Sequence, residues 1–127
     1  MAESILSFQQ LRVYQKAFEL QHGVFETSKH WPREEKFSLT DQVRRSSRSV
    51  GANLAEAWAK RKYPAYFISK LTDADGELQE TTHWLATALA SKYISPEEHS
   101  KFNIQIREIG KMLGKMMMIP EKFRSEI

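Results

Sequence analysis

One stretch constrains the fold of this chain more than any other: residues 39–61 read LTDQVRRSSRSVGANLAEAWAKR. At about 100° per residue, its apolar positions fall on one face that is wide enough to be buried. That face consists of Leu39, Val43, Ser46, Val50, Leu54 and Ala57. Much of the remaining surface is serine, alanine or glycine, and such small side chains let neighbouring helices approach closely. The stretch therefore predicts a helix that packs against protein on more than one side.

Boundary signals divide the rest of the chain into three more helices. Ser7 and Ser95 are typical N-cap residues, Pro64 and Pro96 suit first helical positions, and Pro120 ends the last helix. The expected helices cover residues 8–28, 39–61, 64–91 and 96–118. Because the connections are short and no strand pattern is present, we predict an all-α fold. The architecture is an antiparallel up-down four-helix bundle in a single domain, residues 1–127.

The helix predicted over residues 8–28 is apolar on two roughly opposite sides. One row is Leu11, Tyr14, Phe18, His22 and Phe25, and the other is Val13, Ala17, Leu20 and Val24. A helix buried completely inside one bundle would explain both rows. We favour the alternative, in which one row faces the core and the other a second copy of the chain, so that the protein is a homo-oligomer.

Composition limits where the protein works and what chemistry it performs. The chain has no cysteine, which excludes disulfides, thiolate metal sites and a cysteine nucleophile, and fits a reducing cytoplasm. The N-terminus lacks a basic region followed by an apolar one, so it is not a signal peptide. No apolar run approaches the roughly 20 residues of a membrane span. We expect a cytoplasmic protein that does not contact the membrane.

Positive charge is concentrated in one part of the chain, although the formal net charge is only +3. Residues 33–62 hold eight basic and four acidic residues, whereas residues 63–91 hold one basic and four acidic. This excess permits a polyanionic partner. The candidate phosphate contacts are Arg44, Arg45, Arg48, Lys60, Arg61, Lys62, Lys111 and Lys115. Since every nucleic-acid sequence offers the same phosphates, we expect binding without sequence specificity.

Aromatic residues accompany the basic ones at the end of the second helix. Trp58, Tyr63 and Tyr66 are suited to stack on single-stranded bases. The alternative is a solvated basic face, in which Arg45 pairs with Asp41 one turn back and the aromatic residues are buried between subunits.

A polar row and two tryptophans are expected to have structural roles. Asn53 and Glu56 lie in a row beside the apolar face, and we expect them to hold helix contacts or the register of subunits. Direct contact with a ligand is the alternative. Trp58 and Trp84 lie off the apolar faces and are expected to contribute to packing or to an interface.

One arrangement of carboxylates and histidines has the composition of a di-iron site. Such bundles use Glu-x-x-His on two helices and one Glu from each of the others. The matching residues are Glu19, His22, Glu56, Glu80, His83 and Glu108. Because the glutamates lie off the core faces, we expect a coincidence of spacing and no metal. No catalytic triad or phosphate-binding loop is present, so we expect neither catalysis nor a cofactor.

The second helix also carries a recognisable sequence pattern. Residues 39–47, LTDQVRRSS, followed by residues 49–56, SVGANLAE, resemble the signature of a bacterial family named after 23S ribosomal RNA intervening sequences. Accessory proteins of diversity-generating retroelements belong to the same group. Further matches are Leu11-x-Val13-x-Gln15-x-Ala17, Ala74-x-Gly76-x-x-x-Glu80, residues 109–113 and residues 120–123. This sequence differs from the family pattern at Ala57, where the family usually has glycine.

The resemblance implies a four-helix bundle that assembles into a ring-like homopentamer. In the retroelement members it also implies a basic surface that binds nucleic acid and a reverse transcriptase. We therefore expect an oligomer that binds RNA or an RNA–DNA intermediate. The alternative is a structural scaffold for a protein such as a reverse transcriptase, without direct contact to nucleic acid.

Overall fold

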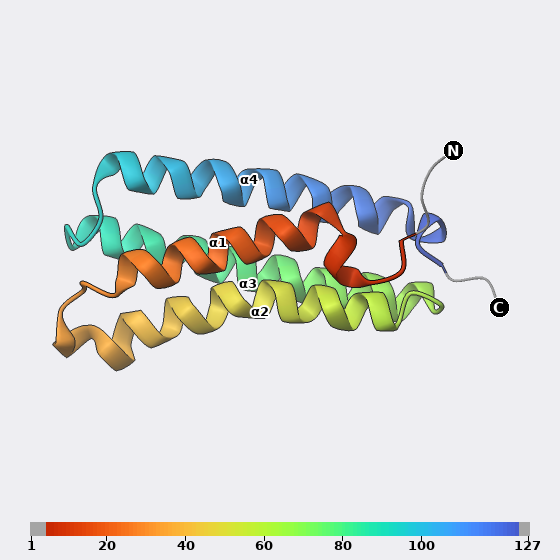
Figure 1. Cartoon of the computed structure of the whole chain (residues 1–127), viewed down its shortest axis with the longest axis horizontal. Coiled ribbons are helices and arrows are strands. Elements are labelled where there is room, and N and C mark those ends of the chain that lie inside the picture. The colour runs from red at the N-terminus through yellow and green to blue at the C-terminus, as the bar shows by residue number, and fades with distance from the viewer. Residues whose placement is uncertain (1–4, 125–127) are drawn as a thin grey trace.

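Four helices make up most of the computed structural model, which describes residues 5–124 (Figure 1). They are α1 (Arg12–Ser28), α2 (Asp41–Ala59), α3 (Pro64–Ala90) and α4 (Pro96–Met118). The described residues contain no strand, so the predicted all-α fold of four helices is confirmed. Within the same residues, no helix combines the length and the apolar character needed to cross a membrane.

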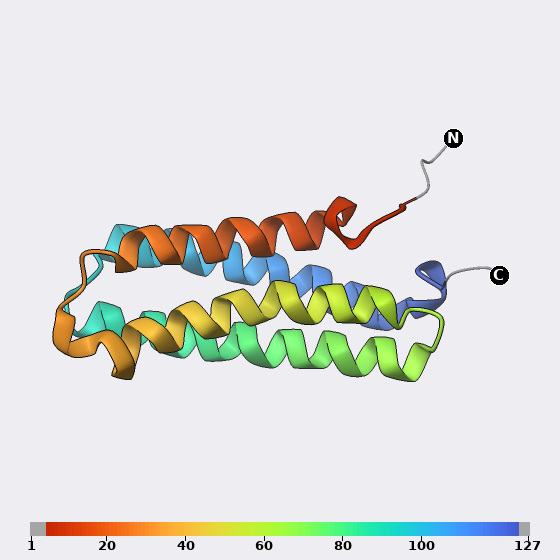
Figure 2. The ribbon, with the colours of Figure 1, turned by 60° about the horizontal axis from the view of Figure 1, so that its bottom comes forward.

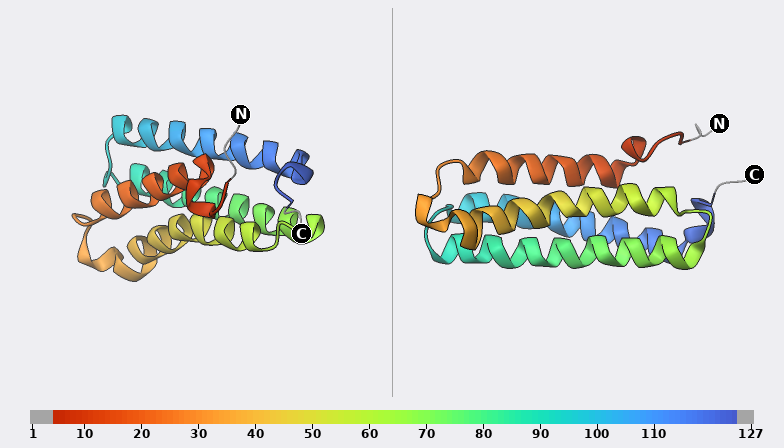
Figure 3. Two further views of the ribbon diagram at one scale, coloured as in Figure 1. Left: turned by 45° about the vertical axis from the view of Figure 1, so that its right-hand side comes forward. Right: turned by 90° about the horizontal axis from the view of Figure 1, so that it is seen from below.

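The connections between helices lie at alternate ends of the molecule (Figures 1 and 2). The α1–α2 and α3–α4 connections share one end. The α2–α3 turn lies at the other end, which we call the turn end. The short 3-10 turns η1 (Phe8–Gln10) and η4 (Pro120–Lys122) lie at this end too. Both α2 and α4 pack against α1 and α3, so α2 and α4 occupy opposite corners (Figure 3).

The core is formed by one apolar face of each helix. Its largest fully buried side chains include Phe67, Leu20, Leu39, Leu54, Leu71, Leu78, Leu85, Ile109 and Leu113. The predicted face of residues 39–57 is buried throughout. The hydroxyls of Ser46 on α2 and Thr81 on α3 lie 2.9 Å apart in this core, where one donates to the other. The accepting hydroxyl donates to a carbonyl of its own helix, that of Val43 for Ser46 or of Glu77 for Thr81. With their hydrogen bonds made, they fit the core without an unpaired polar group.

The first helix begins later than predicted. Ser7 is an N-cap, but it caps η1: its hydroxyl accepts from the Gln9 amide, while the Gln10 side chain accepts from the Ser7 amide. Leu11 is then extended, with φ −66° and ψ 127°, and α1 starts at Arg12. The extended residue interrupts the hydrogen-bond ladder, so the predicted helix over residues 8–28 is two elements.

The second helix is shorter than predicted at both ends. A five-residue π-helical turn, η3 (Lys36–Thr40), leads into α2 without a break. Leu39 and Thr40 are already buried in this turn. At the other end α2 stops at Ala59, because Lys60 leaves helical geometry with φ −104° and ψ 10°.

The boundary between α3 and α4 follows the sequence signals. After α3, Lys92 has φ 65°, while the Lys92 amide donates to the Leu89 carbonyl and the Tyr93 amide to the Ala88 carbonyl. This pattern is a Schellman motif, although the left-handed position usually holds glycine. Ser95 then caps α4 in a reciprocal capping box with Glu98. The predicted start and end of this helix are confirmed.

Candidate nucleic-acid interface

Arg45 is bound to acidic residues of the neighbouring helix. Its guanidinium lies 2.8 Å from Glu80 Oε2 and 3.4 Å from Glu77 Oε2, both on α3. The alternative pairing with Asp41 is therefore wrong: α3 packs closely on α2 and its carboxylates lie nearer than the one a turn back. The hydrogen bond to Glu80 raises the pKa of Arg45. The positive charge of Arg45 is thus balanced within the subunit.

The carboxylate of Glu80 is the centre of this network. It also accepts from Trp84 Nε1 at 3.1 Å, which gives the half-buried Trp84 a polar partner. Hydrogen bonds from Trp84 and then Arg45 hold the pKa of Glu80 below its usual value. Trp84, Glu80 and Arg45 together link α3 to α2.

Glu80→Gln is expected to lower the free energy of unfolding near pH 7 by about 1 kcal/mol or less, because the pair is partly exposed. The lowered pKa means that the ionised carboxylate stabilises the folded chain above its unfolded-state pKa, which is near 4.5. This contribution is lost as the pH falls through the folded-state pKa. Urea unfolding should therefore separate wild type and variant more near pH 7 than near pH 3.

Glu19→Gln is the matched control, because Glu19 is exposed and makes no ion pair among the described residues. It should leave stability unchanged at both pH values. If Glu80→Gln lowers the free energy of unfolding equally at both pH values, the role assigned to the Glu80 charge is contradicted.

Arg44 and Arg48 lie against an aromatic ring of α1. Arg44 Nε donates to Ser28 Oγ at 2.8 Å, and its guanidinium carbon lies 4.7 Å from the centre of the Phe25 ring. The guanidinium of Arg48 lies 5.4 Å from the same centre, and the Lys29 ammonium 4.9 Å. Arg44 is thus engaged in joining α1 to α2, whereas Arg48 stays exposed.

The three basic residues that follow α2 have different surroundings. Arg61 donates to the Trp58 carbonyl at 2.9 Å and covers the Trp58 ring at 4.0 Å, so both side chains are occupied locally. Lys60 and Lys62 make no ion pair within residues 5–124. They are the basic side chains of the α2–α3 turn that are available to a phosphate.

The remaining predicted contacts lie on another corner of the bundle. Lys111 and Lys115 are exposed on α4, which is diagonal to α2. Lys115 is in the last turn of α4, where the helix dipole favours a cation. Apart from Arg45, which is bound to α3, the predicted basic residues form three groups: Arg44 and Arg48 against α1, Lys60 to Lys62 at the turn end, and the two lysines of α4.

The residues assigned structural roles make contacts within the subunit. Glu56 pairs with Lys70 of α3 at 2.9 Å, a partner that sequence reasoning missed. Asn53 donates to the Ser49 carbonyl of its own helix at 2.9 Å. Trp58 is partly buried and packs on the core.

The six residues considered for a di-iron site do not converge. Glu19, His22, Glu56, His83 and Glu108 are exposed, and Glu80 is bound to Arg45 and Trp84. Glu108 pairs with Lys16 at 2.7 Å. In the part of the chain that the structure describes, no three His, Asp or Glu side chains form a group able to hold a metal ion.

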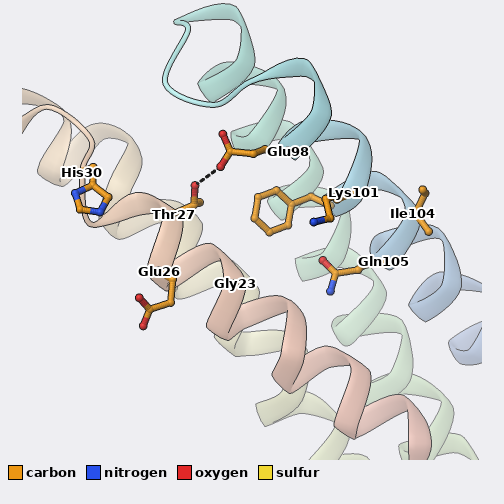
Figure 4. Close-up of a pocket in the computed structure, with 9 residues that line it drawn as sticks. Gly23, Glu26, Thr27, His30, Glu98, Lys101, Ile104 and Gln105 are labelled. Carbon is orange, nitrogen blue, oxygen red and sulfur yellow. Dashed lines mark hydrogen bonds between the residues drawn. The ribbon is translucent and has the colours of Figure 1, made fainter.

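A pocket between α1 and α4 was not predicted from the sequence (Figure 4). It has a volume of about 730 Å³ and is lined by Gly23, Glu26, Thr27, His30, Glu98, Lys101, Phe102, Ile104 and Gln105. At one end Thr27 Oγ1 donates to Glu98 Oε2 at 2.9 Å. A Cβ on Gly23 would lie 3.3 Å from the Phe102 ring, so glycine allows the two helices to approach there.

The outward row of α1 is only partly covered within the subunit. Val13, Ala17, Leu20 and Val24 are buried, whereas the side chain of Phe18 is 50% exposed and His22 is exposed. Tyr14 and Phe25 are intermediate. Complete burial of α1 inside one bundle, the alternative considered above, is therefore wrong for the single chain.

Comparisons with known proteins agree with the pattern in the second helix. The model of the family described as 23S rRNA-intervening sequence protein matches residues 9–115. A crystal structure of a protein of unknown function from the S23 ribosomal protein family of Bacteroides thetaiotaomicron is 33% identical, with a TM-score of 0.75. The match covers 84% of this chain and 95% of that one. Among curated proteins there is no match. The chain belongs to the family of 23S rRNA-intervening sequence proteins.

Proposed function

We propose that this chain is a non-enzymatic bundle that binds nucleic acid, RNA or an RNA–DNA intermediate, without sequence specificity. The observation that carries the proposal is the pair Lys60 and Lys62 at the turn end. They have no ionic partner among the described residues, and the sequence between Glu56 and Asp73 contains four basic residues and no acidic one. A positive site of this kind attracts phosphates through release of their counterions. Arg48, Lys111 and Lys115 add exposed positive charge elsewhere.

The proposal includes assembly into a ring-like homo-oligomer, a pentamer, of antiparallel up-down bundles. Helix connections at alternate ends support the antiparallel arrangement. The partly exposed row of α1 and the neighbouring α1–α4 pocket support an interface with a second copy. Several copies in one assembly act together through effective concentration, so a modest basic group in each becomes a strong site. We place this assembly in the cytoplasm.

A protein scaffold is the second candidate function. The α1–α4 pocket is predominantly apolar, with Phe102 and Ile104 in its lining, and such a groove suits a protein partner. In this candidate a reverse transcriptase or another protein docks on the bundle, and nucleic acid does not touch it.

A salt titration tests the proposed function. Sedimentation velocity with a fluorescently labelled single-stranded oligonucleotide measures affinity and the number of chains together. We expect the logarithm of Kd to rise linearly with the logarithm of salt concentration, by about 0.7 for each phosphate neutralised on a single strand. Absence of binding even at low salt would reject the proposal. Docking of a protein partner through an apolar groove should change little over the same range.

A further inference from the structure

We propose that the turn between α2 and α3 is a stacking site for unpaired bases, so that the protein prefers single-stranded to double-stranded nucleic acid. This inference rests on the proposed function and names the form of nucleic acid that the site takes. Its four side chains are Lys60, Lys62, Tyr63 and Tyr66, which we call the tyrosine–lysine turn.

The two tyrosine rings are the available aromatic surface of this turn. Tyr63 is 56% exposed and Tyr66 is 61% exposed. Their centres are 6.2 Å apart and their planes are perpendicular, so the two rings present faces in different directions. The nearby Trp58 differs, because it is partly buried and the Arg61 guanidinium lies closer to its ring, 4.0 Å from the centre, than either lysine lies to a tyrosine ring. Base stacking is therefore assigned to the tyrosines and not to the tryptophan.

The turn is held firmly beneath these rings. Pro64 occupies the first position of α3, where its fixed backbone angle suits the helix. Phe67, the residue after Tyr66, is fully buried and stacks on Phe123 of the segment after α4, with ring centres 5.6 Å apart. A rigid support keeps the loss of entropy small when a base stacks on the exposed rings.

Each tyrosine ring has a lysine ammonium over one of its two faces, and the other face is the one assigned to a base. The Lys60 ammonium lies 5.5 Å from the centre of the Tyr66 ring, and the Lys62 ammonium lies 5.9 Å from that of Tyr63. No acidic residue lies between Glu56 and Asp73 in the sequence, and Glu56 is itself paired with Lys70. Proteins that bind single-stranded nucleic acid combine aromatic side chains, on which bases stack, with positive side chains that contact the backbone.

A duplex cannot use the rings in this way. Its bases are stacked on one another, and taking one out costs a few kcal/mol. A duplex can therefore meet the lysines through its phosphates but leaves the tyrosine faces unused. Unpaired nucleotides offer a free base face and a phosphate within the same short segment, which matches the alternation of rings and cations in the turn.

The test compares three probes of equal length: a single-stranded oligothymidylate of about 20 nucleotides, the same backbone without bases, and a duplex. Tyr63→Ala with Tyr66→Ala is expected to weaken binding of the base-containing single strand by about 5- to 150-fold for each ring. Binding of the abasic strand and of the duplex should not change, because both make only phosphate contacts. Tyr63→Phe with Tyr66→Phe keeps the rings and should retain the affinity.

Phe37→Ala is the matched control. Phe37 is 73% exposed, and the Lys36 ammonium lies 5.3 Å from its ring, but it belongs to η3 at the opposite end of the bundle. Its loss should leave all three affinities unchanged.

Other outcomes would overturn the inference in distinct ways. Equal affinities of wild type and the double alanine variant for the base-containing strand would reject stacking while leaving phosphate binding intact. Equal losses for the strands with and without bases would assign the tyrosines to another role. If the double alanine variant without nucleic acid has a sedimentation coefficient different from that of the wild type, the rings are buried between copies of the chain. If the wild type binds none of the probes, the proposed function fails as well.

Discussion

Lys60→Glu with Lys62→Glu is expected to weaken binding of a single-stranded oligonucleotide about a hundredfold or more near 0.1 M salt. Each subunit loses two positive charges and gains two negative ones beside the tyrosines. Neither lysine makes an ion pair among the described residues, so the substitutions should leave the fold and the assembly unchanged. Fluorescence anisotropy with the labelled strand measures the change in Kd.

Lys36→Glu with Lys92→Glu is the control, because it changes the net charge by the same amount. Both residues are exposed and lie at the end of the bundle opposite the turn end. This variant should lose little affinity, because exposed charges farther apart than about 10 Å are screened from one another at this salt concentration. Equal losses in the two variants would mean that net charge matters and not the tyrosine–lysine turn.

Phe67→Ala is expected to lower the free energy of unfolding by about 3–5 kcal/mol. The ring is fully buried, and its stacking on Phe123 joins the start of α3 to the segment after α4. Its removal leaves a cavity between these elements that the surrounding helices can fill only partly. Urea unfolding followed by circular dichroism measures the loss.

The adjacent Tyr66→Ala is the natural comparison. Tyr66 is 61% exposed, so its replacement should change stability by no more than about 0.5 kcal/mol. Similar losses for the two variants would show that the support beneath the turn does not depend on the buried ring.

Features that depend on local sequence could be predicted. The apolar face from Leu39 to Ala57 follows from helical periodicity, and all its members are buried. The start of α4 follows from Ser95, Pro96 and Glu98, whose mutual contacts span one turn. In these segments the interactions that decide the structure are formed between residues close in the chain.

Features that depend on distant residues could not be predicted. Arg45 pairs with Glu77 and Glu80, which are 32 and 35 positions away, because the packing of α2 on α3 selects its partner. The α1–α4 pocket needs side chains from two helices whose register the sequence does not specify. Leu11 breaks the first helix through its own backbone angles, although its neighbours follow a helical pattern.

The candidate site could be predicted in composition but not in arrangement. Eight basic residues were named from the sequence as candidate phosphate contacts, and contacts across the α1–α2 and α2–α3 interfaces decide which of them are available. Arg44 contacts Ser28 and Phe25, and Arg45 pairs with the acidic residues of α3. Lys60 and Lys62 instead contact the exposed tyrosines.

The central claim is that Lys60 and Lys62 contact phosphates, and the salt dependence of binding tests it most directly. The slope of log Kd against log salt counts the phosphates that the protein neutralises. For the single-stranded oligonucleotide, the slope of Lys60→Glu with Lys62→Glu should be smaller than that of the wild type by at least about 1.4, or about 0.7 for each lysine. Equal slopes for the two proteins would contradict the claim.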